Sequence, residues 1–559
     1  MSDCCDHHEP GDYYDLGGFH RPVTTSSAQA QTWCDRGLAW TYGFHHEEAR
    51  RCFERAVEAD PDCAIAHWGI AYVVGPNYNK AWDAYDPLDL TDSLATARRS
   101  GEAAAAHAAG ASEVEAALIA TLPARYPDLA ATEGDPFWAE GYATAMREVY
   151  ARFPDDTEVA ALFGEALLGV TPWQLWDLPT GQPAAGAHTV EAREVLERAL
   201  ATEAGRRHPG VLHLYVHLME MSPTPEAAAE AGDLLRDLVP DAGHLRHMPT
   251  HIDVLLGDYA RVVESNAAAA DADDRYAERE GAVNFYTLYR AHDLHFLVYG
   301  AMFLGRRDVA LAASDRLVAA LPETLLRVES PPMADWLEAF VPIRTHVLIR
   351  FGMWPELIAE PLPDDPDLFA ATTAFVHYGR GVAYSATGRV AEAELERELF
   401  RAAAGRVPET RYLFNNTVAD ILAIASAMLD GELDYRRGDH DAAFASLRRS
   451  IELDDDLPYD EPWGWMQPTR HAYGALLLEQ GHVDEAAAVY RADLGYDDTL
   501  PRALRHPRNV WSLHGYHECL VRQGALVGAA AVQEELDAAL AQADVPIAAS
   551  CACRTVSTG

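Results

Sequence analysis

Seven histidines within residues 208–295 fall into three groups whose spacing is typical of metal ligands. They are His213 and His217, then His244, His247 and His251, and then His292 and His295. The first two lie four residues apart, which places both imidazoles on one face of a helix. Glu220 and Asp293 follow closely in sequence, and we expect them to orient imidazoles or accept protons. These two carboxylates are the candidate catalytic residues.

The three groups are separated by about one helical repeat each. Equivalent helices of consecutive repeats stack side by side in a solenoid, so their ligands can converge on one groove wall. Six or seven imidazoles exceed the four ligands of a structural zinc ion and predict a multinuclear site. We favour copper, because imidazole suits it and Met248 offers a thioether, with zinc or iron as alternatives. A di-iron site would show two Glu-x-x-His motifs, and we do not find two.

Local sequence places the second group on both sides of a helix start. The proline after Met248 disfavours helical geometry at Met248, so a helix is predicted to begin at Pro249, with His251 in its first turn. His244 and His247 are then expected on the loop before it. A hydrogen-bonded histidine network that orders the groove is the alternative to metal binding, because i,i+4 pairs arise often in a helical chain.

The elements that carry these residues are predicted to be helices. Strand signals are scarce, and apolar residues recur at helical spacing from end to end. Residues 34–60 match the tetratricopeptide unit of two helices ended by Asp-Pro, and similar units follow. The fold class is all-α: a tetratricopeptide-like solenoid of degenerate helix-turn-helix repeats, closed or strongly curved. We divide the chain into an acidic Cys- and His-containing segment at 1–30, the solenoid at 31–545 and a tail at 546–559.

Composition limits the partners of this protein. With 44 basic and 87 acidic residues the formal net charge is −43, which repels nucleic acid and anionic membranes. No apolar run is long enough to span a bilayer, and the acidic N-terminus lacks the apolar core of a signal peptide. We therefore expect a cytoplasmic protein with neither nucleic acid nor membrane as its partner.

Both ends of the chain carry closely spaced cysteines. Cys4 and Cys5 open the sequence, and Cys551 and Cys553 form a Cys-x-Cys motif on a tail that we expect to be exposed. Thiolates select soft ions such as Cu(I), so Cys551 and Cys553 are candidates for metal delivery. The alternative is disordered termini with incidental cysteines.

Several stretches resemble a histidine-rich group of bacterial tetratricopeptide-repeat proteins. They are Tyr42-Gly-Phe-His-His46, Gly75-Pro-Asn77, Gly243-His-Leu-Arg-His-Met-Pro-Thr-His-Ile252, Tyr289-Arg-Ala-His-Asp-Leu-His295 and Asn509-Val-Trp511-Ser-Leu-His-Gly. The resemblance spans most of the chain, and it implies no activity. It implies that the histidine positions shared by this group are His46, His213, His217, His247, His251, His292 and His295. His46 is thus a further candidate ligand.

The leading functional hypothesis is a metal-dependent oxidoreductase. A multinuclear copper site in the groove would support oxygen-dependent oxidation of a small molecule. Its pocket could be lined by aromatic residues, namely Trp173, Trp176, Tyr215, Tyr286 and Tyr289. The alternative is a non-catalytic tetratricopeptide scaffold that holds a partner peptide in its groove, which is the usual role of such arrays, or a metal-buffering protein.

Overall fold

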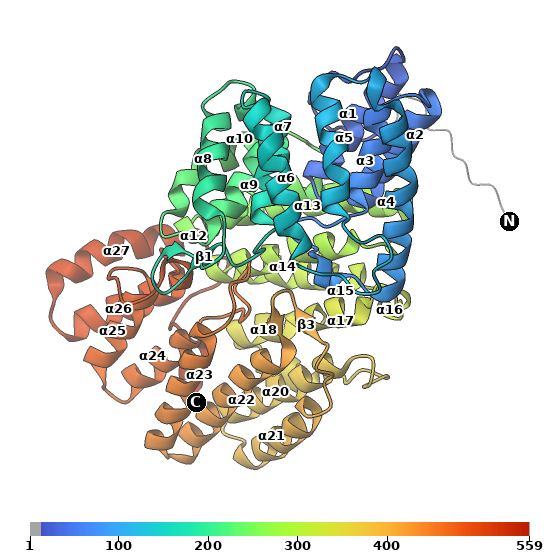
Figure 1. The fold of residues 1–559 in the computed structure, drawn as a ribbon. Coiled ribbons are helices and arrows are strands. Elements are labelled where there is room, and N and C mark those ends of the chain that lie inside the picture. The colour runs from blue at the N-terminus through green and yellow to red at the C-terminus, as the bar shows by residue number, and fades with distance from the viewer. Residues whose placement is uncertain (1–12, 558–559) are drawn as a thin grey trace.

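The computed structural model describes residues 13–557 and consists almost entirely of helices that pack as successive pairs (Figure 1). The helices of the N-terminal part are α1 (Ala28–Tyr42), α2 (His46–Ala59), α3 (Ala64–Val73), α4 (Pro87–His107), α5 (Glu113–Arg125), α6 (Trp138–Arg152), α7 (Thr157–Leu168) and α8 (Thr189–Leu200). Those of the middle part are α9 (Pro209–Glu220), α10 (Ala229–Leu235), α11 (Gly243–His247), α12 (Thr250–Leu256), α13 (Tyr259–Glu280), α14 (Thr287–Leu304), α15 (Arg307–Ala320), α16 (Glu323–Leu326), α17 (Met333–Leu337), α18 (Ile343–Arg350) and α19 (Trp354–Ala359).

The C-terminal part continues the same architecture. Its helices are α20 (Ala370–Ala386), α21 (Val390–Ala404), α22 (Val418–Arg437), α23 (His440–Asp455), α24 (Thr469–Glu479), α25 (Val483–Asp493), α26 (Val510–Arg522) and α27 (Leu526–Leu540). Short 3-10 turns lie at Trp82–Ala84, Ala108–Gly110, Gly205–Arg207, Pro225–Ala228, Glu338–Phe340, Arg502–Leu504 and Ala552–Ser557. Two small antiparallel hairpins pair β1 (Trp176–Asp177) with β2 (Gln182–Pro183) and β3 (Tyr412–Leu413) with β4 (Asn416–Thr417). The all-α solenoid predicted from the sequence is confirmed.

Small residues and caps set the geometry of the helix pairs. A Cβ on Gly37 of α1 would lie 2.8 Å from the ring of Phe53 on α2, so only glycine permits this close packing. Gly305 ends α14 in the left-handed conformation, with φ at 73°, which is a common helix C-terminus. Ser112 begins α5 with a complete capping box. These signals position the helices that carry the histidines.

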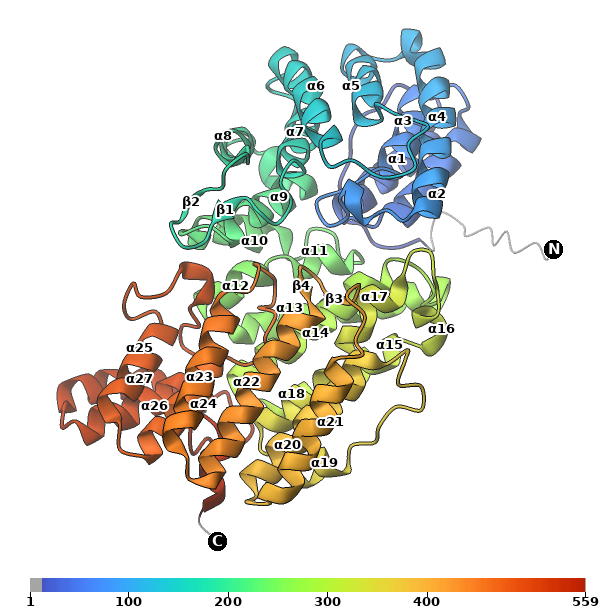
Figure 2. The same ribbon diagram turned by 60° about the horizontal axis from the view of Figure 1, so that its bottom comes forward.

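The solenoid is strongly curved, so that repeats far apart in sequence touch. Arg51 on α2 pairs with Glu280 at the end of α13 at 2.6 Å. The indole of Trp511 on α26 donates to the carbonyl of Met302 on α14 at 2.8 Å. Figure 2 shows the central helices α13 and α14 between the N-terminal and C-terminal halves of the chain. The loop between α23 and α24 brings Glu461 against His251 on α12.

One local prediction was wrong. Met248 is helical, with φ at −48° and ψ at −39°, and His244 and His247 lie on the short helix α11 rather than on a loop. A proline disfavours helical geometry at the preceding residue but does not forbid it. The start of α12 at Thr250, directly after Pro249, agrees with the predicted helix start and keeps His251 in its first turn.

The ends of the described chain pack on the solenoid. The hydroxyl of Tyr13 donates to Glu48, and α1 begins at Ala28, ahead of the predicted boundary at residue 31. The C-terminal tail is not exposed as expected, because Cys553 is buried and Arg436 donates to its carbonyl. Cys4 and Cys5 lie outside the described residues. From residue 13 to residue 557, no helix combines the length and apolar character needed to cross a bilayer.

Candidate metal centre

Six of the eight histidines predicted as ligands come together from helices α9, α11, α12 and α14. His213 and His217 lie on α9, the next three on α11 and α12, and His292 on α14. All six imidazoles are buried, with at most 7% of any of these residues exposed. The solenoid therefore brings together side chains that are separated by up to 79 residues in sequence, from 213 to 292.

The six imidazoles form two groups of three. One triad is His213, His217 and His244, and the other is His247, His251 and His292. Within each triad, one potential ligand nitrogen per ring lies within 4.8 Å of the others. The triads adjoin each other, since the rings of His217 and His251 are 5.6 Å apart and those of His244 and His247 are 5.7 Å apart.

Hydrogen bonds engage Nδ1 of two rings of the first triad, whereas neither nitrogen of His244 has a partner. Nδ1 of His213 donates to the carbonyl of Tyr42 at 2.6 Å, and a carbonyl can only accept. Nδ1 of His217 lies 3.0 Å from Glu220 Oε1. The Nε2 atoms of both rings are buried without a hydrogen-bond partner. In the neutral tautomer each carries a lone pair that points into the site, as in metal-ligating histidines.

The second triad contains two nitrogens that face each other without an obvious proton. Nε2 of His247 lies 2.6 Å from Nε2 of His251. Nδ1 of His247 must donate to Asn266 Oδ1, because the Asn266 amide nitrogen already donates to Val262 O and Thr250 Oγ1. Nδ1 of His251 lies 2.7 Å from Glu220 Oε2. If Nδ1 of His251 donates to an ionised Glu220, the two neutral rings oppose lone pair to lone pair, an arrangement that a cation would relieve; if Nδ1 accepts from a protonated carboxyl, Nε2 of His251 donates to His247 instead.

Glu220 connects the two triads. Its Oε1 accepts from His217 of one triad and its Oε2 from His251 of the other. Glu461 also contacts Nδ1 of His251. One Nδ1 proton cannot serve two carboxylates, and burial raises the pKa of both Glu220 and Glu461, which favours a proton on one of them. Glu220 thus contacts one imidazole of each triad.

Burial keeps the site imidazoles neutral. It lowers the pKa of His213 to about 4 and that of His247 to about 3. The pKa values of His217 and His251 also lie well below the usual value, because of burial and then of neighbouring imidazoles. Neutral imidazole is the form that binds metal.

Asp293 lies beside the second triad. Its Oδ1 is 3.5 Å from Nδ1 of His247, and its carboxylate, His244 and His247 form a further group of potential ligand atoms within 4.8 Å. Burial, and then the adjacent Asp273, raise the pKa of Asp293 well above its usual value. A carboxyl in this position can hold a proton next to the imidazoles.

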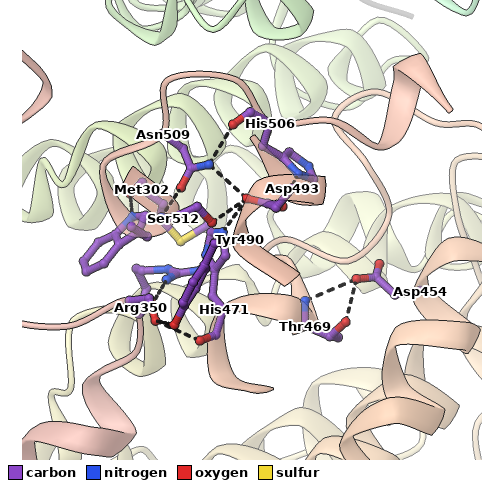
Figure 3. Close-up of polar contacts among 12 residues, drawn as sticks. Met302, Arg350, Asp454, Thr469, His471, Tyr490, Asp493, His506, Asn509 and Ser512 are labelled. Carbon is purple, nitrogen blue, oxygen red and sulfur yellow. Dashed lines mark hydrogen bonds and ion pairs between the residues drawn. The ribbon is translucent and has the colours of Figure 1, made fainter. Parts of the chain in front are cut away.

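A second buried histidine network, around Asp493, has a different character (Figure 3). Both ring nitrogens of His471 are engaged: Arg350 donates to Nδ1 at 3.0 Å, and Nε2 donates to Asp493 at 3.0 Å. Asp493 also accepts from Ser512 and Asn509. This network is satisfied by the protein alone and ties α24, α25 and α26 together. The candidate metal centre is not satisfied in this way.

Two predicted ligands lie away from this centre. His295 packs edge-on to Phe340, with ring centroids 5.1 Å apart, beside His346. His46 lies at the start of α2, where burial lowers its pKa to about 3. Neither belongs to any group of three potential ligand residues among the described part of the chain. Met248 is buried in the hydrophobic core.

A cavity of about 500 Å³ adjoins the histidines. His292 of the second triad lines it. Tyr78 and Trp173 also line it, and their rings lie 4.6 and 5.6 Å from the ring of His217. Of the five aromatic residues expected around a pocket, Trp173 and Tyr289 line this cavity. The others do not line it: Trp176 donates to Leu218 O, Tyr215 to Glu197 and Tyr286 to Asp273.

The sequence did not indicate three of the residues that build this centre. Glu461 is 210 positions after His251, and Asn266 and Tyr42 act through an amide oxygen and a main-chain carbonyl. No spacing rule connects such groups to the histidines. Asp460 and Glu461, in the loop after α23, are both buried in the structure. Two adjacent acidic residues are the sequence feature that comes closest to marking this loop.

The C-terminal cysteines form a separate group. Cys551 and Cys553 are joined in a disulfide, and their sulfurs and a carboxylate oxygen of Glu432 lie within 4.8 Å of one another. Glu432 is buried, and its Oε2 has no hydrogen-bond partner. This group offers thiolates only when the disulfide is reduced.

Comparison with known proteins identifies the repeat but not the centre. A chain of a solved structure described as Naa15/Naa10 bound to HypK-THB is 13% identical; the match covers 91% of this chain and 70% of that one, with a TM-score of 0.20. A circular tandem repeat protein with novel repeat topology is also 13% identical, with 92% and 96% coverage and a TM-score of 0.12. No curated protein matches. The tetratricopeptide repeat family matches residues 30–63, so the chain carries a tetratricopeptide repeat within its helical solenoid.

Proposed function

We propose that the protein binds two transition-metal ions at the six buried histidines and acts on a small molecule in the adjoining cavity. The observation that carries the proposal is the pair of Nε2 atoms of His247 and His251, 2.6 Å apart, with both Nδ1 atoms engaged elsewhere. The orphaned Nε2 atoms of His213 and His217 support it. Buried polar atoms without partners are rare unless another group satisfies them.

The donor set fits such ions. His213, His217 and His244 would hold one ion, and His247, His251 and His292 the other. Three protein ligands per ion leave a position open for a small molecule, as in catalytic sites. An imidazole-rich set suits copper, with zinc and iron as alternatives.

Oxidation of a small molecule by dioxygen is the chemistry that bound copper would supply. Electrons and protons would leave the small molecule, and dioxygen would accept them. The chain's own residues would bind the substrate in the cavity, keep water away and hold a proton at Glu220, Glu461 or Asp293, whose pKa values burial raises. We place the protein, as part of this proposal, in the histidine-rich tetratricopeptide group and in the cytoplasm.

Oxygen uptake tests the chemistry. Copper-loaded protein should consume dioxygen with a reducing phenol such as 4-methylcatechol at least about 100-fold faster than the metal-free protein, since general acid–base groups and bound metal each supply factors of this size. Free copper at the same concentration and the His217→Ala variant are the controls. Uptake no faster than with free copper would contradict the oxidase activity while leaving metal binding open.

The repeat match supports a second candidate function. Residues 30–63 match the tetratricopeptide family, whose arrays commonly hold a partner peptide. A non-catalytic scaffold of this kind, or a metal buffer, would need no open ligand position and no substrate cavity. Capture of a peptide by metal-free and metal-loaded protein alike would favour the scaffold.

Metal delivery by Cys551 and Cys553 remains part of the proposal. The reduced motif, with Glu432 beside it, offers the soft ligands that Cu(I) prefers. Reduction would break the S–S bond, with two electrons and two protons supplied by a thiol reductant.

A further inference from the structure

The walls of the cavity beside the histidine centre favour aromatic ligands. Its volume of about 500 Å³ falls in the range of small-molecule sites. Five of the aromatic residues in its wall are Tyr78, Trp82, Trp173, Phe285 and Trp336. Flat rings pack on such faces by stacking or edge-to-face contact. A small molecule with an aromatic ring therefore matches the shape and surface of this wall.

Acidic groups of the wall disfavour an anion. Glu165, Asp460 and Glu461 line the cavity and are buried. With Asp83, the wall holds four acidic residues against two basic ones. The net charge of −43 also disfavours an anion.

The two basic residues of the wall each lie near a carboxyl group of the protein. Lys80, the only lysine in the chain, pairs with Asp89 at 2.6 Å. Arg125 donates to the carbonyls of Tyr72 and Pro76 at 3.2 and 2.6 Å. Lys80 is therefore held in an ion pair. Arg125 lies near the carboxyl of Glu165, which also lines the cavity, but Nε of Arg125 has no hydrogen-bond partner.

Some oxygens of the wall residues lack partners. Oε1 of Glu165 is buried without a hydrogen bond, and Oδ1 of Asn79 and the hydroxyl of Tyr289 lie close to each other outside normal hydrogen-bond geometry. Amide and carboxylate oxygens accept hydrogen bonds. A ligand that donates an O–H or N–H would satisfy these groups.

We infer that this cavity binds a small aromatic molecule that is uncharged or cationic and carries a hydrogen-bond donor. The inference rests on the proposed function, because His292 belongs both to the cavity wall and to the second triad. Cationic ligands gain further from the aromatic faces.

Titration calorimetry with a matched series of phenols tests the inference on metal-free and metal-loaded protein. Tyramine (cationic) and 4-ethylphenol (neutral) should bind at least about 10-fold more tightly than 4-hydroxyphenylacetate (anionic), because the acidic residues of the wall disfavour a carboxylate. Methylating the phenol of tyramine should weaken binding about 10-fold, because it removes the donor. Trp336→Ala should weaken tyramine binding, whereas Tyr496→Ala, an exposed position outside the cavity, should not.

Two results would overturn the inference: equal or tighter binding of 4-hydroxyphenylacetate, or no binding of tyramine and 4-ethylphenol up to about 1 mM, the limit of weak affinity. Circular dichroism confirms that each variant is folded. Because binding is measured without metal as well, a protein that takes up no metal but still binds phenols would refute the proposed function and not the cavity assignment.

Discussion

Replacing His251 by alanine should lower the metal content from about two ions per chain to about one, because three ligands hold each ion and His251 belongs to only one triad. The remaining ion would keep His213, His217 and His244. His251 also faces His247 and Glu220, so its loss relieves the opposed lone pairs while leaving a small cavity. Helicity should stay unchanged, and metal is measured by elemental mass spectrometry of untagged protein.

His377→Ala is the matched control for this variant. His377 is also buried and also pairs with a glutamate, Glu396, at 2.7 Å, but it belongs to no ligand group. Its replacement should reduce thermal stability without reducing metal content. Equal metal content in His251→Ala and wild-type protein would show that the second triad does not bind an ion.

Changing Glu220 to glutamine should weaken metal binding about 10- to 100-fold, the usual effect of losing a group that orients ligands. Glu220 accepts from His217 with one oxygen and from His251 with the other. Glutamine keeps the size but has one acceptor oxygen and one donor nitrogen. The donor would face an imidazole N–H, so one histidine must move its proton to Nε2, where it blocks the ion. Competition with a chromophoric chelator measures the change in affinity.

Glu165→Gln provides the matched comparison. Glu165 is a buried carboxyl that accepts from Tyr72 at 2.6 Å and contacts none of the six histidines. Metal affinity should therefore stay within about 3-fold of wild type, the ordinary scatter of a remote substitution. If the two variants bind metal equally well, Glu220 does not orient the ligands.

Sequence reasoning predicted the repeat architecture and most of the buried histidine cluster. The spacing of His213 and His217 and the recurrence of the groups at repeat intervals placed six imidazoles together, because stacked repeats repeat their geometry. The i,i+3 spacing of His292 and His295 does not decide whether both side chains reach one site, and the resemblance that implies His46 does not fix its position. Both are predicted ligands, and each lies away from the centre. The division into two triads follows from the tertiary structure alone.

The parts that sequence could not predict depend on long-range packing. Glu461 reaches His251 from a loop 210 residues away because the solenoid is strongly curved. The tail with Cys551 and Cys553 docks on the solenoid through main-chain contacts, including Arg350 with the Ser550 carbonyl at 3.1 Å. Main-chain partners leave no pattern in side-chain identity, so the docking of the tail had no sequence signal.

The metal content of untagged wild-type protein, purified without chelators, tests the central claim most directly. Elemental mass spectrometry should find about two transition-metal ions per chain, since each triad supplies the three ligands of a catalytic-type ion, and changing both His217 and His251 should reduce the content to near zero. A protein that carries no metal, takes up none from a metal buffer and has normal thermal stability would contradict the account. The six histidines would then form a structural hydrogen-bond network, as His471 does with Arg350 and Asp493.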